Sequence, residues 1–101
     1  MATWYSIELN DDESAKKTIQ RIMDAFIPKY VGAGRPLDMA IFSSYNPEDK
    51  LITVYLSPKA SSLAMQFGAG PCDDTFVNTD LTLLVGDQKS IELLFPDAQP
   101  K

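Results

Sequence analysis

Short segments in which apolar and polar residues alternate predict the strands of this chain. In residues 3–9 every second side chain is apolar, which is the two-residue period of a half-buried strand. Residues 50–57 alternate in the same way, residues 38–45 also read as a strand, and the turn-forming stretch 46–49 between them indicates a hairpin. Residues 81–85 form a short apolar run that is typical of a buried strand.

Apolar residues at helical spacing predict two helices. The longer helix follows Asn10, whose distance from Glu13 fits a capping box, and its apolar residues recur three or four positions apart. Pro28 is expected to end or kink this helix, because a proline ring disfavours helical geometry in the residue before it. The shorter helix covers residues 59–67, with Ser57 as its cap.

The order of these elements predicts an α+β fold, a ferredoxin-like split β-α-β sandwich with one additional C-terminal element. Residues 68–80 are expected to be a loop. Residues 91–95 fit either a last strand or one helical turn, and we favour a strand because the preceding turn-rich stretch suits a hairpin. The prediction is therefore one domain over residues 1–101, with an antiparallel-dominated sheet and both helices on one face.

Two helices would leave the second face of such a sheet uncovered. The strand alternation places on that face Trp4, Ser6, Glu8, Leu51, Thr53, Tyr55, Thr82, Leu84 and either Ile41 or Phe42. This face is too apolar and aromatic to be stable in water. It is therefore expected either to pair with a second copy of the chain, giving a homodimer, or to form a ligand pocket. The candidate ligand-binding residues are Trp4, Glu8, Phe42 and Tyr55, with the carboxylate as the polar anchor for a cationic ligand.

Charge and composition narrow the partners. The 101 residues include nine Lys and Arg against 14 Asp and Glu, a net charge of −5, which disfavours nucleic acid and acidic lipid and favours a basic or cationic partner. The N-terminal sequence has no basic flank followed by an apolar run, and no stretch approaches 18 apolar residues. A single cysteine favours a reducing compartment. We expect a cytoplasmic protein without a membrane segment.

Candidate catalytic chemistry is sparse. The chain has no histidine, which removes the commonest general base and the commonest zinc ligand. Cys72 is followed by Asp73 and Asp74, whose charges should raise the thiol pKa and so oppose a catalytic role. These two carboxylates and Asp80 could in principle hold a hard cation, but aspartates in such loops usually form turns and caps. We predict no metal site and no cofactor.

The leading hypothesis is a small non-catalytic domain that self-associates or binds a small apolar or cationic ligand through the second sheet face. The first alternative is an enzyme in which Glu8 is the general base, with Tyr55 or Tyr5 nearby, in a cleft between that face and residues 68–80. The second alternative is an acidic protein-interaction or inhibitor domain that engages a basic surface.

Overall fold

A computed structural model of the protein describes residues 3–73, 76 and 80–95. These residues form five strands, three α-helices and one short 3₁₀ helix. In chain order they are β1 (Trp4–Asn10), α1 (Glu13–Gly32), β2 (Ile41–Asn46), β3 (Leu51–Leu56), η1 (Pro58–Ala60), α2 (Ser61–Gln66), β4 (Gly70–Cys72), β5 (Thr82–Val85) and α3 (Gln88–Leu94). Among the described helices, none combines the length and the apolar character that crossing a membrane requires.

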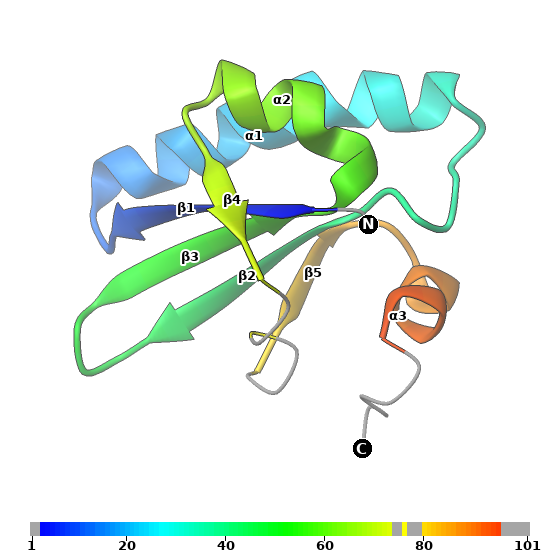
Figure 1. The fold of residues 1–101 in the computed structure, drawn as a ribbon. Coiled ribbons are helices and arrows are strands. Elements are labelled where there is room, and N and C mark those ends of the chain that lie inside the picture. The colour runs from blue at the N-terminus through cyan, green and yellow to red at the C-terminus, as the bar shows by residue number, and fades with distance from the viewer. Residues whose placement is uncertain (1–2, 74–75, 77–79, 96–101) are drawn as a thin grey trace.

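All five strands belong to one sheet, in the order β4-β1-β3-β2-β5, and every neighbouring pair is antiparallel. The predicted α+β fold with an antiparallel sheet is therefore confirmed. Helices α1 and α2 lie over one face of the sheet, as predicted (Figure 1). A third helix, α3, lies beside β5 and below α1 and α2 in the same view, and the prediction included it only as the alternative to a strand.

The cap of α1 differs from the predicted one. Asp12, not Asn10, is the N-cap residue, and its carboxylate accepts the backbone N–H of Ala15 at 3.1 Å and the hydroxyl of Ser14 at 2.6 Å. The helix also continues through Pro28 to Gly32. A proline removes one backbone donor, and burial of the apolar stripe of α1 offsets that loss.

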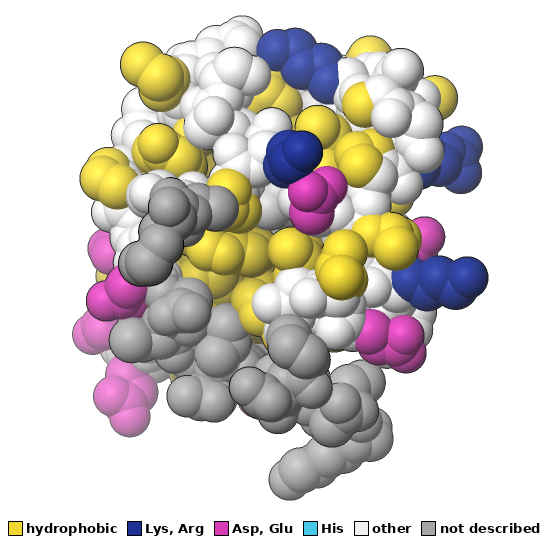
Figure 2. Space-filling view, turned by 45° about the vertical axis from the view of Figure 1, so that its right-hand side comes forward, with side chains coloured by type: hydrophobic (Ala, Val, Ile, Leu, Met, Phe, Trp, Pro, Cys, Tyr) yellow, Lys and Arg dark blue, Asp and Glu magenta, His cyan; other side chains and the backbone are white. Residues whose placement is uncertain are grey.

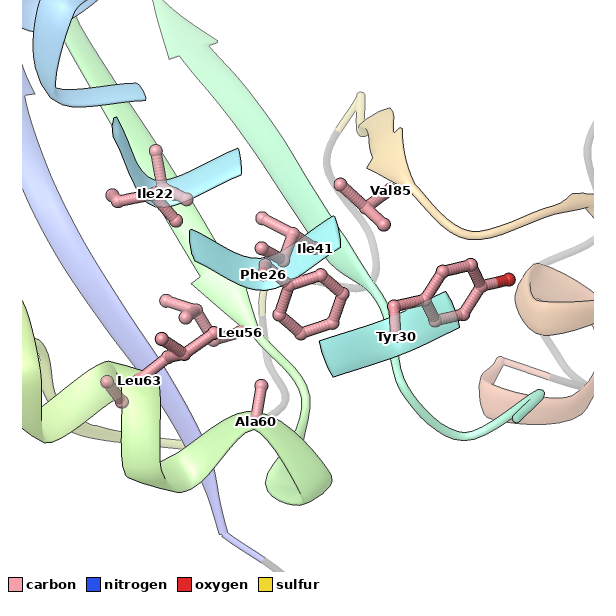
Figure 3. Close-up of a cluster of buried hydrophobic side chains, with 10 residues drawn as sticks. Ile22, Phe26, Tyr30, Ile41, Leu56, Ala60, Leu63 and Val85 are labelled. Atoms are coloured by element: carbon pink, nitrogen blue, oxygen red, sulfur yellow. The ribbon is translucent and has the colours of Figure 1, made fainter. Parts of the chain in front are cut away.

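The main core lies between this stripe and the sheet. Ile22, Phe26 and Tyr30 of α1 are buried, and Figure 3 shows them over side chains from the strands and from the η1–α2 segment. The buried members of this core are Ile22, Phe26, Tyr30, Ile41, Val54, Leu56, Ala60, Leu63, Ala64 and Val85. Its strand members follow the two-residue period, so the alternation in residues 50–57 marked the buried face correctly.

Strands β2 and β3 form the predicted hairpin and pair along their whole length. The side-chain oxygen of Asn46 accepts the backbone N–H groups of Glu48 and Asp49, which closes the turn. Ser57 precedes η1, as expected, but makes no side-chain cap bond. Its buried hydroxyl instead accepts the N–H of Ala40 at 3.0 Å and so joins the strand ends.

The C-terminal half departs from the prediction. The stretch 68–80, expected to be a loop, contains β4, which pairs with the start of β1. Pro71 is tolerated there because β4 is an edge strand and needs no donor on its outer side. The run 81–85, which was expected to be the fourth strand in chain order, is instead the fifth, β5. It lies at the opposite edge of the sheet, beside β2. Residues 91–95, for which we favoured a strand, belong mostly to α3.

A register shift between Ile41 and Phe42 changes which side chains of β5 face the helices. Val85 pairs with Ile41 and joins the main core, whereas Leu83 pairs with Phe42 on the second face. Leu84, predicted on the second face, packs against the main core instead. Strict alternation fails here because a bulge inserts an unpaired residue and reorients the strand.

The second face of the sheet is covered at one end by its own chain. An aromatic cluster there consists of Trp4, Phe42, Tyr55, Phe76 and Phe95. Phe95 directly follows α3 and stacks on Trp4, with 5.4 Å between ring centroids. Gly86 makes the turn into α3 at φ +132°, where a Cβ would lie 3.2 Å from that of Ala40, and Asp87 with Ser90 forms a capping box.

We predict that Phe95→Ala lowers the free energy of unfolding by about 3 kcal/mol, because Phe95 is only 6% exposed and its removal leaves a cavity in the aromatic cluster. The matched control is Leu93→Ala on the same helix, where the side chain is 55% exposed and the expected cost is below about 0.5 kcal/mol. Urea denaturation followed by the fluorescence of Trp4 measures both. Equal costs for the two variants would contradict the assigned packing of α3.

Asp12 should make stability depend on pH. The hydrogen bonds from Ser14 and from the N–H of Ala15 lower its pKa in the folded state. Its contribution is therefore present above the ordinary carboxyl pKa of about 4 and is lost as the pH falls through the lower folded value. We expect the advantage of the native chain over Asp12→Ala to shrink between pH 6 and pH 2. The advantage of Asp12→Asn over Asp12→Ala should stay constant, since asparagine caps without titrating. The urea midpoints of the native chain and of both variants, measured at pH 6 and at pH 2, test this expectation.

Candidate functional site

The second face of the sheet is divided into an aromatic half and a polar half. Residues that pair across strands lie in rows on this face. In one row Tyr55 lies beside Phe42, whereas in the next row Thr53 lies between Glu8 and Ser44. The aromatic cluster covers the first row, and the second row begins where the cluster ends. The polar half thus has a floor of hydroxyl and carboxylate side chains.

A groove of about 290 Å³ lies at the boundary between the two halves and is open on one side. Among the described residues, its lining includes two carboxylates, three hydroxyl groups, one thiol and one phenyl ring, and no basic side chain. The lining residues are Ser6, Glu8, Thr53, Tyr55, Cys72, Asp73 and Phe76. They come from β1, β3, β4 and the segment that follows β4, so the sheet itself positions most of them.

The four predicted ligand-binding residues do not stay together. Glu8 and Tyr55 line the groove, as expected for the polar anchor and one wall. Trp4 and Phe42 belong to the aromatic cluster and do not line it. Phe76 occupies the space expected to be a pocket, because its ring stacks on Tyr55 at 4.0 Å between centroids and lies 5.1 Å from Trp4. The aromatic pocket predicted from the sequence is thus filled by the chain itself.

Cys72 is half-buried at the wall of the groove. Burial raises the pKa of its thiol, a hydrogen bond with Ser6 lowers it, and the charge of Asp73 raises it. The predicted direction of the shift is therefore confirmed, although burial, and not the neighbouring carboxylate, is the largest cause. A thiol in this state is protonated at neutral pH and is a poor nucleophile.

Tyr55 presents a neutral phenol to the groove. Burial is the largest cause that raises the pKa of this phenol, and electrostatic repulsion by Cys72 in its ionised form and by Glu8 acts in the same direction, whereas a hydrogen bond with Thr53 lowers it. At neutral pH the hydroxyl can therefore donate a hydrogen bond as well as accept one. Glu8 is exposed on the floor of the groove, so its carboxylate is accessible to a ligand.

Acidic side chains do not gather into a metal site within the described ranges, where no group of three or more histidine, cysteine, aspartate or glutamate residues could hold an ion. Of the three aspartates considered from the sequence, Asp73 lines the groove and Asp80 is exposed. Asp74 lies outside the described residues. Asp73 therefore acts, in this arrangement, as part of the groove.

Phe76 is the site residue that the sequence analysis missed. It is 5% exposed and forms the end wall of the groove, although it lies in a stretch rich in aspartate and threonine. A lone aromatic residue in a polar loop is the signal that could have indicated an anchor, since such a ring is rarely left in water. Its partner on the sheet could not be identified from spacing, because the two residues are far apart in sequence.

Two other surface features differ from the groove in their charge. A wider hollow of about 510 Å³ lies between α1 and α2, and its lining mixes a basic and an acidic side chain, Arg21 and Asp24. Large apolar side chains are exposed on several elements, and Figure 2 shows one face on which they occur in several places. These exposed side chains are Ile27, Val31, Leu37, Tyr45, Met65 and Leu93. Neither feature concentrates charge of one sign, as the groove does.

We predict that Cys72 is alkylated more slowly by iodoacetamide in the native protein than in the urea-unfolded protein at pH 7.5. The raised pKa leaves less thiolate, and burial restricts access. Alkylation rates measured over a range of pH separate the two causes. Unfolding should lower the pH midpoint of the rate profile, which reports the thiol pKa, and any change in the limiting rate at high pH reports access. Identical midpoints in both states would contradict the proposed environment of the thiol.

Comparisons with protein-family models, with curated proteins and with solved structures find no match. No relative therefore assigns a role to the groove. Its function has to be inferred from the chemistry of the side chains that line it.

Proposed function

We propose that the protein is a non-catalytic binding domain that captures a small, positively charged group in the groove. The observation that carries this proposal is the composition of the lining, in which the carboxylates of Glu8 and Asp73 are present and the described lining residues include no Lys or Arg. The hydroxyl groups of Ser6, Thr53 and Tyr55 add acceptors for an ammonium or guanidinium group. The net charge of −5 would attract such a ligand from a distance.

The size of the groove supports a small ligand group bound with modest affinity. Its volume of about 290 Å³ is at the lower end of the range for ligand pockets. The aromatic rings of Tyr55 and Phe76 can contact the aliphatic part of an amine while its charged end reaches Glu8. Since Glu8 is exposed, we expect a dissociation constant of about 1 mM for a simple amine. A purely apolar ligand is less suited to this polar lining.

Self-association through the second sheet face loses its original argument. That argument required an aromatic surface in contact with water, but Phe76, Phe95 and α3 cover the aromatic half. Trp4 and Tyr55 are both largely withdrawn from solvent. A homodimer remains a prediction about the solution state, and it would now need a different surface.

An enzyme with a carboxylate and tyrosine site is the second candidate. It is favoured by one observation, namely that Glu8 and Tyr55 line the same groove as residues 72, 73 and 76, close to the cleft expected for it. We rank it lower because Glu8 is exposed, whereas carboxylates that act as general bases are usually tuned by desolvation. Cys72 is protonated and offers no nucleophile in its place.

We further propose that the fold is an extended ferredoxin-like sandwich. Two features support this: β3 separates the parallel strands β1 and β2, and β1 separates the parallel strands β3 and β4, which are two split β-α-β units. Strand β5 and helix α3 would then be additions to it. Because this fold carries many unrelated functions, it does not select among the hypotheses above.

The proposal predicts selective binding of n-butylammonium over butyrate. In a titration monitored by NMR, the amide chemical shifts of Glu8, Thr53 and Tyr55 should change with the amine and stay unchanged with butyrate. Glu8→Gln should weaken amine binding by about fivefold, which corresponds to the loss of one partly exposed ion pair. Raising the salt to 0.5 M should weaken binding further, because exposed charges are screened.

Glu92→Gln is the matched control, since Glu92 is an exposed carboxylate on α3 and does not line the groove. It removes the same charge from the protein and should leave amine binding within about twofold of the native value. Equal losses in both variants would mean that net charge, and not the groove, attracts the amine, and the proposal would then be wrong.

A further inference from the structure

Strand β1 has an outer edge that β4 covers only in part. The three residues of β4 pair with Trp4, Tyr5 and Ser6. Strand β1 continues to Asn10 and pairs with β3 to its end. Residues 7–10 therefore have a neighbouring strand on one side only within the described part of the chain. Figure 1 shows the end of β1 extending past β4.

The direction of the backbone groups on this edge follows from one hydrogen bond. The N–H of Asp11 donates to the carbonyl oxygen of Lys50 at 3.0 Å, toward the β3 side. Alternate residues of a strand point both backbone groups to the same side. Odd-numbered residues of β1 therefore face β3, and the even-numbered ones face the outer edge, in agreement with the pairing of Ser6 with Gly70. The N–H and C=O of Glu8 thus point outward, beyond the end of β4.

Glu8 accordingly offers two kinds of contact. Its backbone N–H and C=O lie in the plane of the sheet at the uncovered edge, and its carboxylate lies on the second face, in the groove. A strand added at this edge would exchange both hydrogen bonds with Glu8. The side chain opposite Glu8 would lie about 5 Å away on the same face, within reach of the carboxylate.

We infer that the cationic group captured by the groove is a lysine or arginine of an extended protein segment that adds to β1 as a short strand. This inference rests on the proposed function and specifies the ligand. The Glu8 side chain selects the basic residue, and the Glu8 backbone holds the extended segment. Acidic residues 11–13, which follow β1, add to the charge complementarity with a basic segment.

A second copy of the chain is a poor occupant of this edge. Antiparallel pairing of two β1 strands about Glu8 would place two glutamates directly opposite each other, which destabilises a sheet. The acidic residues that follow β1 would approach the partner copy as well. The charge at the edge therefore favours a basic partner segment over self-pairing.

Hydrogen exchange on the free protein tests the edge first. The amides of Ile7 and Leu9 should be protected, since they bond to β3, whereas the amide of Glu8 should exchange rapidly. Protection of the Glu8 amide in the free protein would mean that the edge is already occupied, and it would overturn the inference. Light scattering on the same sample shows whether a second copy is the occupant.

Binding is tested with a capped five-residue peptide that has a central lysine between valines, compared with n-butylamine. The peptide should bind about tenfold more tightly, because two added hydrogen bonds of ordinary net strength are worth about that factor. N-methylation of the lysine amide should abolish this gain. N-methylation of the following valine amide should not, because that amide points away from β1. The Glu8→Gln variant should lose affinity for both probes.

The outcomes separate the two proposals. If the amine binds but the peptide is no tighter and neither methylation matters, the groove binds amines and strand addition is overturned. If neither probe binds, both proposals fail. If the two methylated peptides lose affinity equally, the peptide does not bind in the assigned register, and the inference is again overturned.

Discussion

The need to keep a group of aromatic side chains out of water governs the second face of this sheet. Alternation in β1, β2 and β3 places Trp4, Phe42 and Tyr55 on the side away from α1 and α2. Two helices on one face cannot shield them. The chain meets this requirement with Phe76, with Phe95 and with α3, which is brought to the sheet by the turn at Gly86. The small second core that results combines these rings with smaller apolar side chains such as Ala40, Leu83 and Ile91, and it depends on segments distant in sequence.

The extent of that cover determines where a ligand can approach. Phe76 ends the aromatic half, and beyond it Glu8 and Thr53 face solvent. The groove exists because the cover stops at this boundary, where an apolar wall meets a polar floor. Sites of this composition suit a ligand with an aliphatic stem and a charged end, and the open edge of β1 beside Glu8 extends the same site into the plane of the sheet.

Local patterns predicted the elements whose structure is dictated locally. The strands at 3–9 and 50–57 have clear periods, and their bounds were predicted within a residue or two. The long helix was predicted from its period as well, but it continues to Gly32, past the proline that was expected to end or kink it. Strand β4 was not predicted because Gly70, Pro71 and Cys72 have little strand preference, and pairing with β1 makes them a strand. Helix α3 was not favoured because five residues cannot separate the two periods. Glu8 and Tyr55 could be assigned to one face from alternation alone. Asp73 and Phe76 could not be placed there, since their positions depend on how the segment after β4 folds back.

The stacking of Trp4 on Phe95 also affects the timing of folding during synthesis. The second residue of this pair is made long after the first, so the aromatic cluster closes only once Phe95 has left the ribosome. Until then Trp4 and Phe42 lack the cover that Phe95 and α3 provide. Only chains that are translated beyond α3 can therefore complete this cluster. Shorter products expose a hydrophobic surface of the kind that chaperones and proteases recognise.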